Sequence, residues 1–362
     1  MNREIIGRRI RAIRKKFNKK KIDSLIVTKP ANVTYTTGFM GEDSWAIITK
    51  RGVYLLTDSR YTEQAEKECI GCRIVSRPNS MAEAVATLLK KLKSAQTIAV
   101  EKSTSVAAFG SLKKRMKLRL KAVSDIIETV RRTKDSREIF AIKASASIAA
   151  KALKQTVGYI KPGVTESELA GMLDFQIRKL GATNSFDTIV AFGPNASRPH
   201  HQPSKRRLKK RDTVLIDFGA RYNGYCSDIT RSFAVGRPTR FFEKVYEAVR
   251  QAQAAAIKTV VAGIEMVKVD AAARQAIRSC DLPVYGHGTG HGFGLEIHEM
   301  PFLKAQSKGK LNAGDVITIE PGIYIPGKLG VRIEDDVLVA DTGCKILTNS
   351  CPHRPHLSGW NV

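Results

Sequence analysis

Hydrophobic positions in the first third of the chain alternate between helix-like and strand-like spacing. Ile6, Ile10, Ile13 and Phe17 recur every three or four residues, which predicts an amphipathic first helix. Short apolar runs typical of buried strands follow at 23–30, 44–49, 52–58 and 97–101, with Pro30 closing the first run and a helix over about 59–68. This alternation predicts an α/β domain in which helices cover a sheet.

The pattern changes near residue 126, where a charged connector passes into a long Ala-rich helix. We therefore expect two domains, at 1–126 and 127–362. Thr165 and Glu168 have the spacing of a capping box, which predicts a helix to about Leu180. Beyond residue 185 strand-like runs predominate, with helices at about 239–262 and 266–279, and neighbouring runs resemble hairpins. The second domain is therefore predicted to be α+β.

Composition adds a strong positive charge to this picture. The 362 residues include 61 Lys and Arg against 34 Asp and Glu, a net charge of +27. A nucleic-acid partner is one explanation of such a charge. The basic runs are scattered and only 7% of residues are aromatic, which favours an ordinary solvated surface. No apolar run spans a bilayer, no secretory signal begins the chain, and six scattered cysteines make no disulfide framework, so we expect a cytoplasmic protein without membrane contact.

Two carboxylates flank a predicted hairpin turn at Asn223-Gly224. If Tyr222 pairs with Tyr225, then Asp217 lies opposite Thr230, and Asp228 lies two residues from Thr230 on the same face. Diagonal neighbours of this kind are about 7–8 Å apart at Cα. Two carboxylates placed in this way repel each other unless a positive group lies between them, so the hairpin indicates a cation site.

A second hairpin repeats this arrangement with Glu320 and Glu334. A register symmetric about residue 327 places the two carboxylates opposite each other, with Arg332 on the same face. The Gly-rich segment 286–301 adds imidazoles at His287, His291 and His298. Four carboxylates and a histidine form an oxygen-rich ligand set that suits Mn, Fe, Co or Zn, and shared carboxylates favour two ions.

Several motifs in this order resemble those of a known family. They are NVTYTTGF (32–39) and LLTDSRYTEQA (55–65) in the first domain, and AFGPNASRPH, IDFGARYNGYCSDITR, GHGTGHGFGLEIHE, IEPGIY and VRIED in the second. The chain resembles the Xaa-Pro peptidases of the pita-bread metallopeptidase family, aminopeptidase P and prolidase, over nearly its whole length. The resemblance implies an α+β pita-bread catalytic domain preceded by a creatinase-type α/β N-terminal domain.

The resemblance also implies roles for the motif residues. The implied metal ligands are Asp217, Asp228 (shared between ions), His291, Glu320 and Glu334 (bridging both ions). The implied catalytic residues are His200 and His298, which hold the scissile region and stabilise the oxyanion or leaving nitrogen, and Glu320, which acts on the attacking water. The residues implied to contact substrate or to support the ligands are His287, Arg332, Tyr324 and Thr230.

The implied reaction is hydrolysis of the peptide bond between an N-terminal residue and a following proline. A hydroxide bridging two divalent ions would attack, with manganese the first choice of metal and cobalt, zinc or iron the others. The implied partners are proline-containing peptides and a second copy of the chain in a homodimer. The sequence does not decide between an Xaa-Pro dipeptidase and an Xaa-Pro aminopeptidase.

Three alternatives to this function are open. A creatinase-like amidinohydrolase shares the fold, but all five implied metal ligands are present here. A methionine aminopeptidase generally lacks such an N-terminal domain. A non-enzymatic module that binds nucleic acid or protein is compatible with the basic runs at 111–121 and 205–211, although the intact ligand set argues against pure binding.

Overall fold

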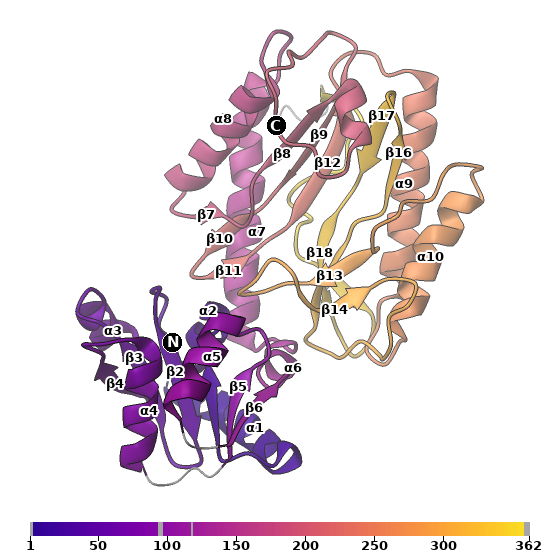
Figure 1. Ribbon diagram of the computed structural model, residues 1–362. Helices are drawn as coiled ribbons and strands as arrows, with labels where there is room; N and C mark the ends of the chain where they lie inside the picture. The colour runs from indigo at the N-terminus through magenta and orange to yellow at the C-terminus, as the bar shows by residue number, and fades with distance from the viewer. Residues whose placement is uncertain (1–2, 93–96, 117–118, 358–362) are drawn as a thin grey trace. The chain divides into compact units, whose positions relative to one another are not determined.

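The chain is arranged in two compact units, 1–131 and 132–362 (Figure 1). The computed structural model describes residues 3–92, 97–116 and 119–357. The division predicted after residue 126 falls just before the short helix α6 (Glu128–Arg131), with which the first unit ends. Within the described ranges, none of the helices combines the length and the apolar character that crossing a bilayer requires.

The first unit is a six-stranded mixed sheet in the order β4-β3-β2-β1-β5-β6, with helices packed against it. Its strands are β1 (Ser24–Val27), β2 (Trp45–Thr49), β3 (Val53–Thr57), β4 (Arg73–Ser76), β5 (Thr97–Glu101) and β6 (Arg119–Val123). Its other helices are α1 (Arg3–Lys20), α2 (Pro30–Thr37), α3 (Thr62–Glu68), α4 (Met81–Leu92) and α5 (Val106–Arg115). The α/β prediction for this part of the chain is confirmed.

Helix α2 corrects one detail of the sequence analysis. The prediction of a strand as far as Pro30 is wrong, because β1 ends at Val27 and Pro30 opens a helix. Proline is well suited to the first turn of a helix, where its missing N–H costs nothing. The residues PANVTYTT include few good helix formers. Tertiary contacts stabilise α2 instead, because the Asn32 amide donates to Glu101 (2.6 Å) and Glu128 (2.7 Å).

The second unit consists of small antiparallel sheets covered by four long helices. The helices are α7 (Ser136–Thr156), α8 (Glu166–Lys179), α9 (Arg240–Thr259) and α10 (Met266–Arg278), with 3-10 turns η1 (Val157–Tyr159) and η2 (Gly193–Ser197). The strands are β7 (Thr183–Asn184), β8 (Ile189–Phe192), β9 (Thr213–Phe218), β10 (Ala220–Tyr222), β11 (Tyr225–Cys226), β12 (Ile229–Ala234), β13 (Gly290–Gly292), β14 (Glu299–Leu303), β15 (Val316–Ile319), β16 (Gly322–Ile325), β17 (Leu329–Arg332), β18 (Asp335–Val339) and β19 (Cys344–Ile346).

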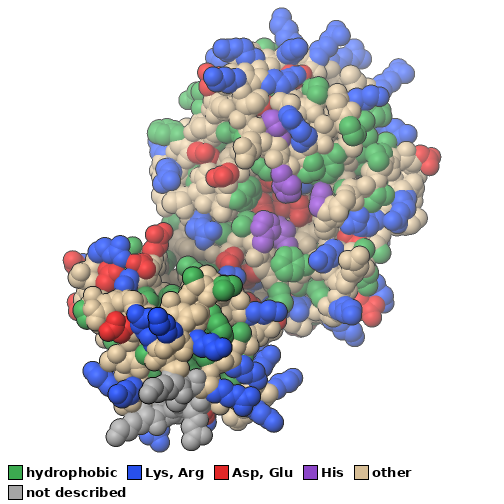
Figure 2. Space-filling view, in the orientation of Figure 1, with side chains coloured by type: hydrophobic (Ala, Val, Ile, Leu, Met, Phe, Trp, Pro, Cys, Tyr) green, Lys and Arg blue, Asp and Glu red, His purple; other side chains and the backbone are tan. Residues whose placement is uncertain are grey.

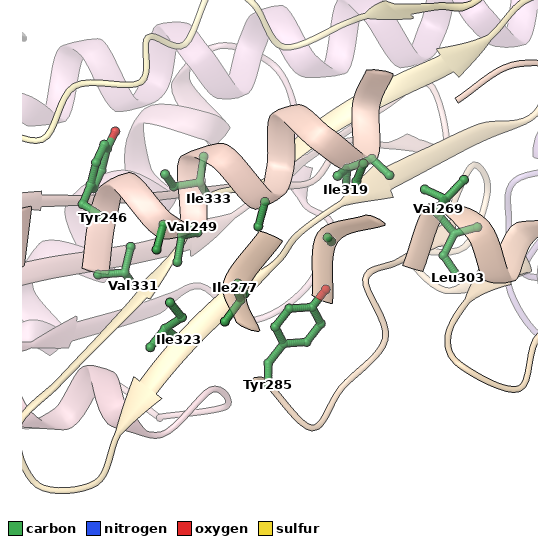
Figure 3. Close-up of a cluster of buried hydrophobic side chains, with 14 of the residues drawn as sticks. Tyr246, Val249, Val269, Ile277, Tyr285, Leu303, Ile319, Ile323, Val331 and Ile333 are labelled. Atoms are coloured by element: carbon green, nitrogen blue, oxygen red, sulfur yellow. The ribbon is translucent and has the colours of Figure 1, made fainter. Parts of the chain in front are cut away.

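Two separate hydrophobic clusters hold the two halves of this unit. In one, α7 and α8 pack on the sheet β12-β9-β8, and the predicted capping box of Thr165 and Glu168 opens α8. In the other, α9 and α10 pack on strands β15 to β18. Figure 3 shows this second cluster, in which Val249 of α9 and Ile277 of α10 lie among strand residues such as Ile323 and Val331. The strands that carry polar residues are thus backed by rigid apolar layers.

Both predicted hairpin registers are confirmed. Tyr222 pairs with Tyr225, and Asp217 lies opposite Thr230. In the second hairpin, Ile319 pairs with Asp335 and Gly322 with Arg332, so the same register about residue 327 runs on both sides of Glu320 and Glu334. The two hairpins are joined where the Glu334 backbone N–H donates to the Thr230 carbonyl (3.1 Å). Four carboxylates from distant parts of the chain are thereby brought to one region.

Strands β13 and β15 approach so closely at Gly290 that only glycine is expected to fit at this position. A Cβ atom at Gly290 would lie 1.9 Å from the Thr318 carbonyl oxygen, which is backbone and cannot turn away. Gly290→Ala should therefore lower the free energy of unfolding by at least the usual cost of over-packing, about 1–3 kcal/mol. Chemical denaturation measures this loss. Gly286→Ala, in the same segment, is the control because a Cβ there has no neighbour within 4 Å; equal stability of the two variants would contradict the prediction.

Candidate metal centre and active-site cavity

A cavity of about 700 Å³ opens in the second unit and collects most of the residues singled out by the sequence analysis. In Figure 2, histidine side chains surround a group of acidic side chains in a hollow of this unit. Tyr324 and Thr230 do not line the cavity but are hydrogen-bonded to residues that do. The predicted residues that line it are His200, Asp217, Asp228, His287, His291, His298, Glu320, Arg332 and Glu334.

The tightest cluster of potential metal ligands is formed by Asp228, His291 and Glu334. One ligand atom from each of these buried residues lies within 4.8 Å of the others. His291 Nε2 is 3.6 Å from Asp228 Oδ2 and 3.7 Å from a carboxylate oxygen of Glu320. His291 Nδ1 faces the Gly292 carbonyl (3.2 Å) and must donate to it, so the Nε2 lone pair points toward the carboxylates. Burial and the neighbouring His298 lower the pKa of His291 to about 3, which keeps the imidazole neutral.

Arg332 and Thr230 fix one carboxylate from each hairpin. Arg332 Nη2 donates to Asp217 Oδ2 (2.6 Å), and Arg332 Nε donates to Thr230 Oγ1 (3.1 Å). Thr230 Oγ1 in turn donates to Glu334 Oε2 (2.6 Å). The other oxygen of Asp217, Oδ1, is buried and has no hydrogen-bond partner among the described residues. A buried carboxylate oxygen without a donor is suited to a cation.

Tyr324 and His287 extend this network to the edge of the cavity. Arg332 Nη1 donates to the Tyr324 hydroxyl oxygen (2.8 Å), which lies 3.0 Å from His287 Nε2. His287 Nδ1 faces the Gly288 carbonyl (2.7 Å) and donates to it, so His287 Nε2 accepts the Tyr324 proton. Burial lowers the pKa of His287 to about 4, in agreement with a neutral ring. The four predicted supporting residues thus form one connected chain of hydrogen bonds.

The carboxylates of the cavity are poorly compensated by the protein itself. Burial, and then repulsion by their acidic neighbours, raises the pKa of Asp228 and of Glu334 well above the ordinary range. Burial raises the pKa of Glu320 to about 8, with Arg332 opposing this rise and Asp217 adding to it. Arg332 is the only Lys or Arg among the described residues that line the cavity. This donor set of carboxylate oxygens and one imidazole fits divalent metal ions.

A second buried network supports Glu334 from behind. Arg231 donates to the Glu334 backbone carbonyl (2.5 Å) and forms an ion pair with Asp335 (2.8 Å). The segment near the C-terminus completes this network, because His353 Nε2 lies 2.7 Å from Asp335 and the Cys351 carbonyl accepts from Arg231. The described part of this segment is packed directly against the strand that follows Glu334.

Several residues of the cavity wall carry no signal in the sequence. His200 and His298 are exposed at the cavity, as the motifs suggest for residues that meet a ligand. His201 also lines the cavity but is buried and bonded to Glu166 (2.8 Å). Adjacent histidines in RPHHQP cannot be assigned by spacing alone. Phe186, Asp187 and Gln202 also line the wall and lie outside the quoted motifs.

Both units are similar to known proteins. Residues 141–341 match the model of metallopeptidase family M24, and residues 9–133 match the creatinase/prolidase N-terminal domain. The chain is 36% identical to an uncharacterized peptidase of Bacillus subtilis, over 94% of this chain and 98% of that protein. The α+β pita-bread fold of the second unit and the creatinase-type first unit are thereby confirmed.

Two solved structures are similar over almost the whole chain. An Xaa-Pro dipeptidase from Bacillus anthracis has 37% identity and a TM-score of 0.93, covering 96% of this chain and 99% of that one. An X-Pro aminopeptidase from Thermotoga maritima has 36% identity and a TM-score of 0.85, covering 91% of this chain and 96% of that one. One of these similar structures is therefore named a dipeptidase and the other an aminopeptidase.

The raised carboxylate pKa values predict that a divalent metal stabilises the protein more as pH rises. Without metal, folded Asp228, Glu320 and Glu334 hold protons that an unfolded chain releases near pH 4. At these three carboxylates the folded state binds more protons than the unfolded state, so their contribution to stability falls as pH rises toward about 8. His287 and His291, whose pKa values are lowered, are neutral above pH 5 with or without metal, so they do not change the difference between the two forms. A bound cation would remove this penalty. The Tm difference between Mn²⁺-loaded and metal-free protein should therefore increase from pH 5 to pH 8.

Differential scanning calorimetry at matched ionic strength tests this dependence. Asp335, whose pKa is lowered, acts at more acidic pH and does not interfere in this window. Glu334→Gln, which removes one of the ionisable groups but keeps its shape, should flatten the pH dependence. A Tm difference that stays constant or shrinks between pH 5 and pH 8 would show that these carboxylates do not bind the metal.

Proposed function

Because the chain belongs to metallopeptidase family M24, we propose that it hydrolyses the peptide bond between an N-terminal residue and a following proline. The observation that carries this proposal is the convergence of Asp217, Asp228, Glu320 and Glu334 with His291 around one cavity. The names of the two similar solved structures support the choice of an Xaa-Pro bond.

We propose that these five residues hold two divalent ions, with manganese the first candidate and cobalt, zinc or iron the others. Asp228 and Glu334 lie deepest and would be shared between the ions. Bound ions would supply Lewis acidity, which brings the pKa of a bound water close to neutrality and polarises a carbonyl group. Arg332 and Thr230 would keep Asp217 and Glu334 in position, since each donates to one of these carboxylates.

Glu320 is proposed to move the proton. Its side chain lines the cavity and keeps 19% of its surface exposed. A carboxylate within hydrogen-bond reach of the attacking water can accept its proton and later donate it. The proline nitrogen must receive a proton to leave, so Glu320 would carry the proton from the water to that nitrogen.

His200 and His298 are proposed to bind the reacting part of the substrate. Both are exposed and line the cavity. Burial lowers the pKa of His298, so this imidazole is neutral and can donate one hydrogen bond. A donor aimed at the carbonyl oxygen stabilises the negative charge that develops there during attack. His200 is proposed to hydrogen-bond to the oxyanion or to the leaving nitrogen.

We infer that the protein forms a homodimer and acts in the cytoplasm, as the family resemblance suggests. Size-exclusion chromatography with light scattering measures the mass, and a monomer across the working concentration range would contradict the dimer.

Peptide cleavage tests the proposed reaction. After loading with Mn²⁺, Co²⁺ or Zn²⁺, the protein should release alanine from Ala-Pro, from Ala-Pro-Ala or from both, but from neither Ala-Ala nor Ala-Ala-Ala, as measured by mass spectrometry. Comparison of Ala-Pro with its amide separates the two activities, because only the terminal carboxylate differs. A dipeptidase should prefer the free acid, and an aminopeptidase should accept the amide and the longer peptide. Absence of cleavage of every Xaa-Pro peptide with all three metals would refute the proposed function.

Ligand substitutions should remove metal and activity together. Asp217→Ala leaves Arg332 without its carboxylate partner and removes a proposed ligand. The metal affinity should fall by more than about 100-fold, the upper end for residues that only support a ligand. Elemental analysis after dialysis measures the metal. Asp187→Asn, another carboxylate of the cavity, should keep its metal content; full metal content in Asp217→Ala would contradict the ligand assignment.

A further inference from the structure

Glu166 is a fully buried carboxylate that the proposed chemistry does not use. It lies in the first turn of α8, outside the lining of the cavity. Five hydrogen-bond donors converge on its two oxygens. Oε1 accepts from the Phe192 backbone N–H (2.7 Å) and the Asn195 side chain (2.8 Å), and Oε2 accepts from His201 Nε2 (2.8 Å), the Ser204 N–H (3.0 Å) and the Ser204 hydroxyl (2.5 Å).

All five donors belong to one segment, residues 192–204, which carries His200. Two donors precede His200 in the chain and three follow it, so Glu166 holds the segment on both sides of this residue. A second anchor acts directly before it, because both terminal nitrogens of Arg332 lie 3.4 Å from the Pro199 carbonyl oxygen. His200 is therefore bracketed by a contact at Pro199 and a contact at His201.

The charge of Glu166 explains why this anchor is strong. Burial alone would raise the pKa of Glu166, but the bonds from His201, Ser204, Asn195 and Phe192 lower it below the ordinary value. The carboxylate is therefore ionised at neutral pH, and hydrogen bonds to an ionised acceptor are about twice as strong as neutral ones. Residues 198–204, which follow η2 and form no strand, need such an anchor to hold a side chain in a fixed place.

We propose that Glu166 is a positioning residue that fixes the 192–204 segment and thereby places His200 for contact with the substrate. This inference rests on the proposed function, because it takes His200 to meet the reacting part of the peptide. Glu166 itself does not reach the substrate; it acts through His200. The chemistry on the metal side should be independent of it, since its partners include none of the proposed ligands.

Glu166→Gln is the most direct test. The amide has nearly the same shape, but its NH2 end cannot accept, so at least two of the five donors lose their acceptor. kcat/KM for an Xaa-Pro peptide should fall by about 10- to 100-fold, the range for displaced catalytic groups and their supports. The Kd for Mn²⁺ should not change. Glu168→Gln is the matched control, because Glu168 lies two residues away, is exposed and, among the described residues, hydrogen-bonds to Thr165 alone.

A double-mutant cycle distinguishes positioning from a general structural role. If Glu166 acts through His200, then Glu166→Gln should cost little further activity in a His200→Ala background. Amide hydrogen exchange should also become faster at 192–204 in Glu166→Gln and stay unchanged at 316–336. Additive losses of activity, or unchanged exchange at 192–204, would overturn the inference.

Two further measurements keep the inference testable. Should Glu166→Gln fail to fold, a double variant of Asn195→Ala and Ser204→Ala removes two side-chain donors and keeps the carboxylate. It should lose less activity than expected for Glu166→Gln, and this loss should also vanish in the His200→Ala background; an additive loss would again overturn the inference. If wild type and Glu168→Gln both fail to cleave any Xaa-Pro peptide, the proposed function fails, whereas hydrogen exchange still decides whether Glu166 holds the segment.

Discussion

Repulsion among carboxylates that converge on one space is the constraint on which the second unit depends. Asp228 and Glu334 are buried close to Glu320 and Asp217, and their raised pKa values express the cost of this arrangement. Such a cluster weakens the fold unless protons or cations neutralise it. The surrounding structure must therefore be rigid enough to hold the carboxylates together. The apolar layers under α7 and α8 and under α9 and α10 provide this rigidity, because they back the strands from which the carboxylates extend.

The positive charge of Arg332 offsets part of this repulsion between carboxylates. Its planar guanidinium donates hydrogen bonds to Asp217, Thr230 and Tyr324 at the same time, which the single ammonium group of a lysine could not do in this geometry. Through Thr230 it also orients Glu334. Its single positive charge compensates only one carboxylate, so the remaining charge stays available for divalent ions. Arg332 therefore orients Asp217 directly and Glu334 through Thr230 without neutralising the whole cluster.

The parts of this arrangement that the sequence predicts are those that depend on local pairing. Asn223-Gly224 and the turn about residue 327 fix two hairpin registers, and period-two alternation then places the carboxylates and Arg332 on shared faces. Helix α2 is not predicted, because its stability depends on Glu101 and Glu128, far along the chain. The role of Glu166 is not predicted for the same reason. In the sequence it is an ordinary acidic residue in the first turn of a helix. Its five donors lie 26 to 38 residues away and become visible only in the fold.

The cavity combines two kinds of support, and they differ in how they hold their residues. Asp217 lies on a paired strand, and Glu320 and Glu334 lie between strands that share one register, so backbone pairing fixes them. His200 lies on an irregular segment that side-chain hydrogen bonds must anchor, with Glu166 bonded on both sides of His200 and Arg332 bonded to Pro199. A change at Glu166 should therefore affect the position of His200 without affecting the proposed metal ligands. They cannot be separated at Arg332, because this residue contacts both Asp217 and Pro199. Arg332 thus couples the position of the proposed metal ligand Asp217 to the position of His200. A substitution of Arg332 is expected to displace both.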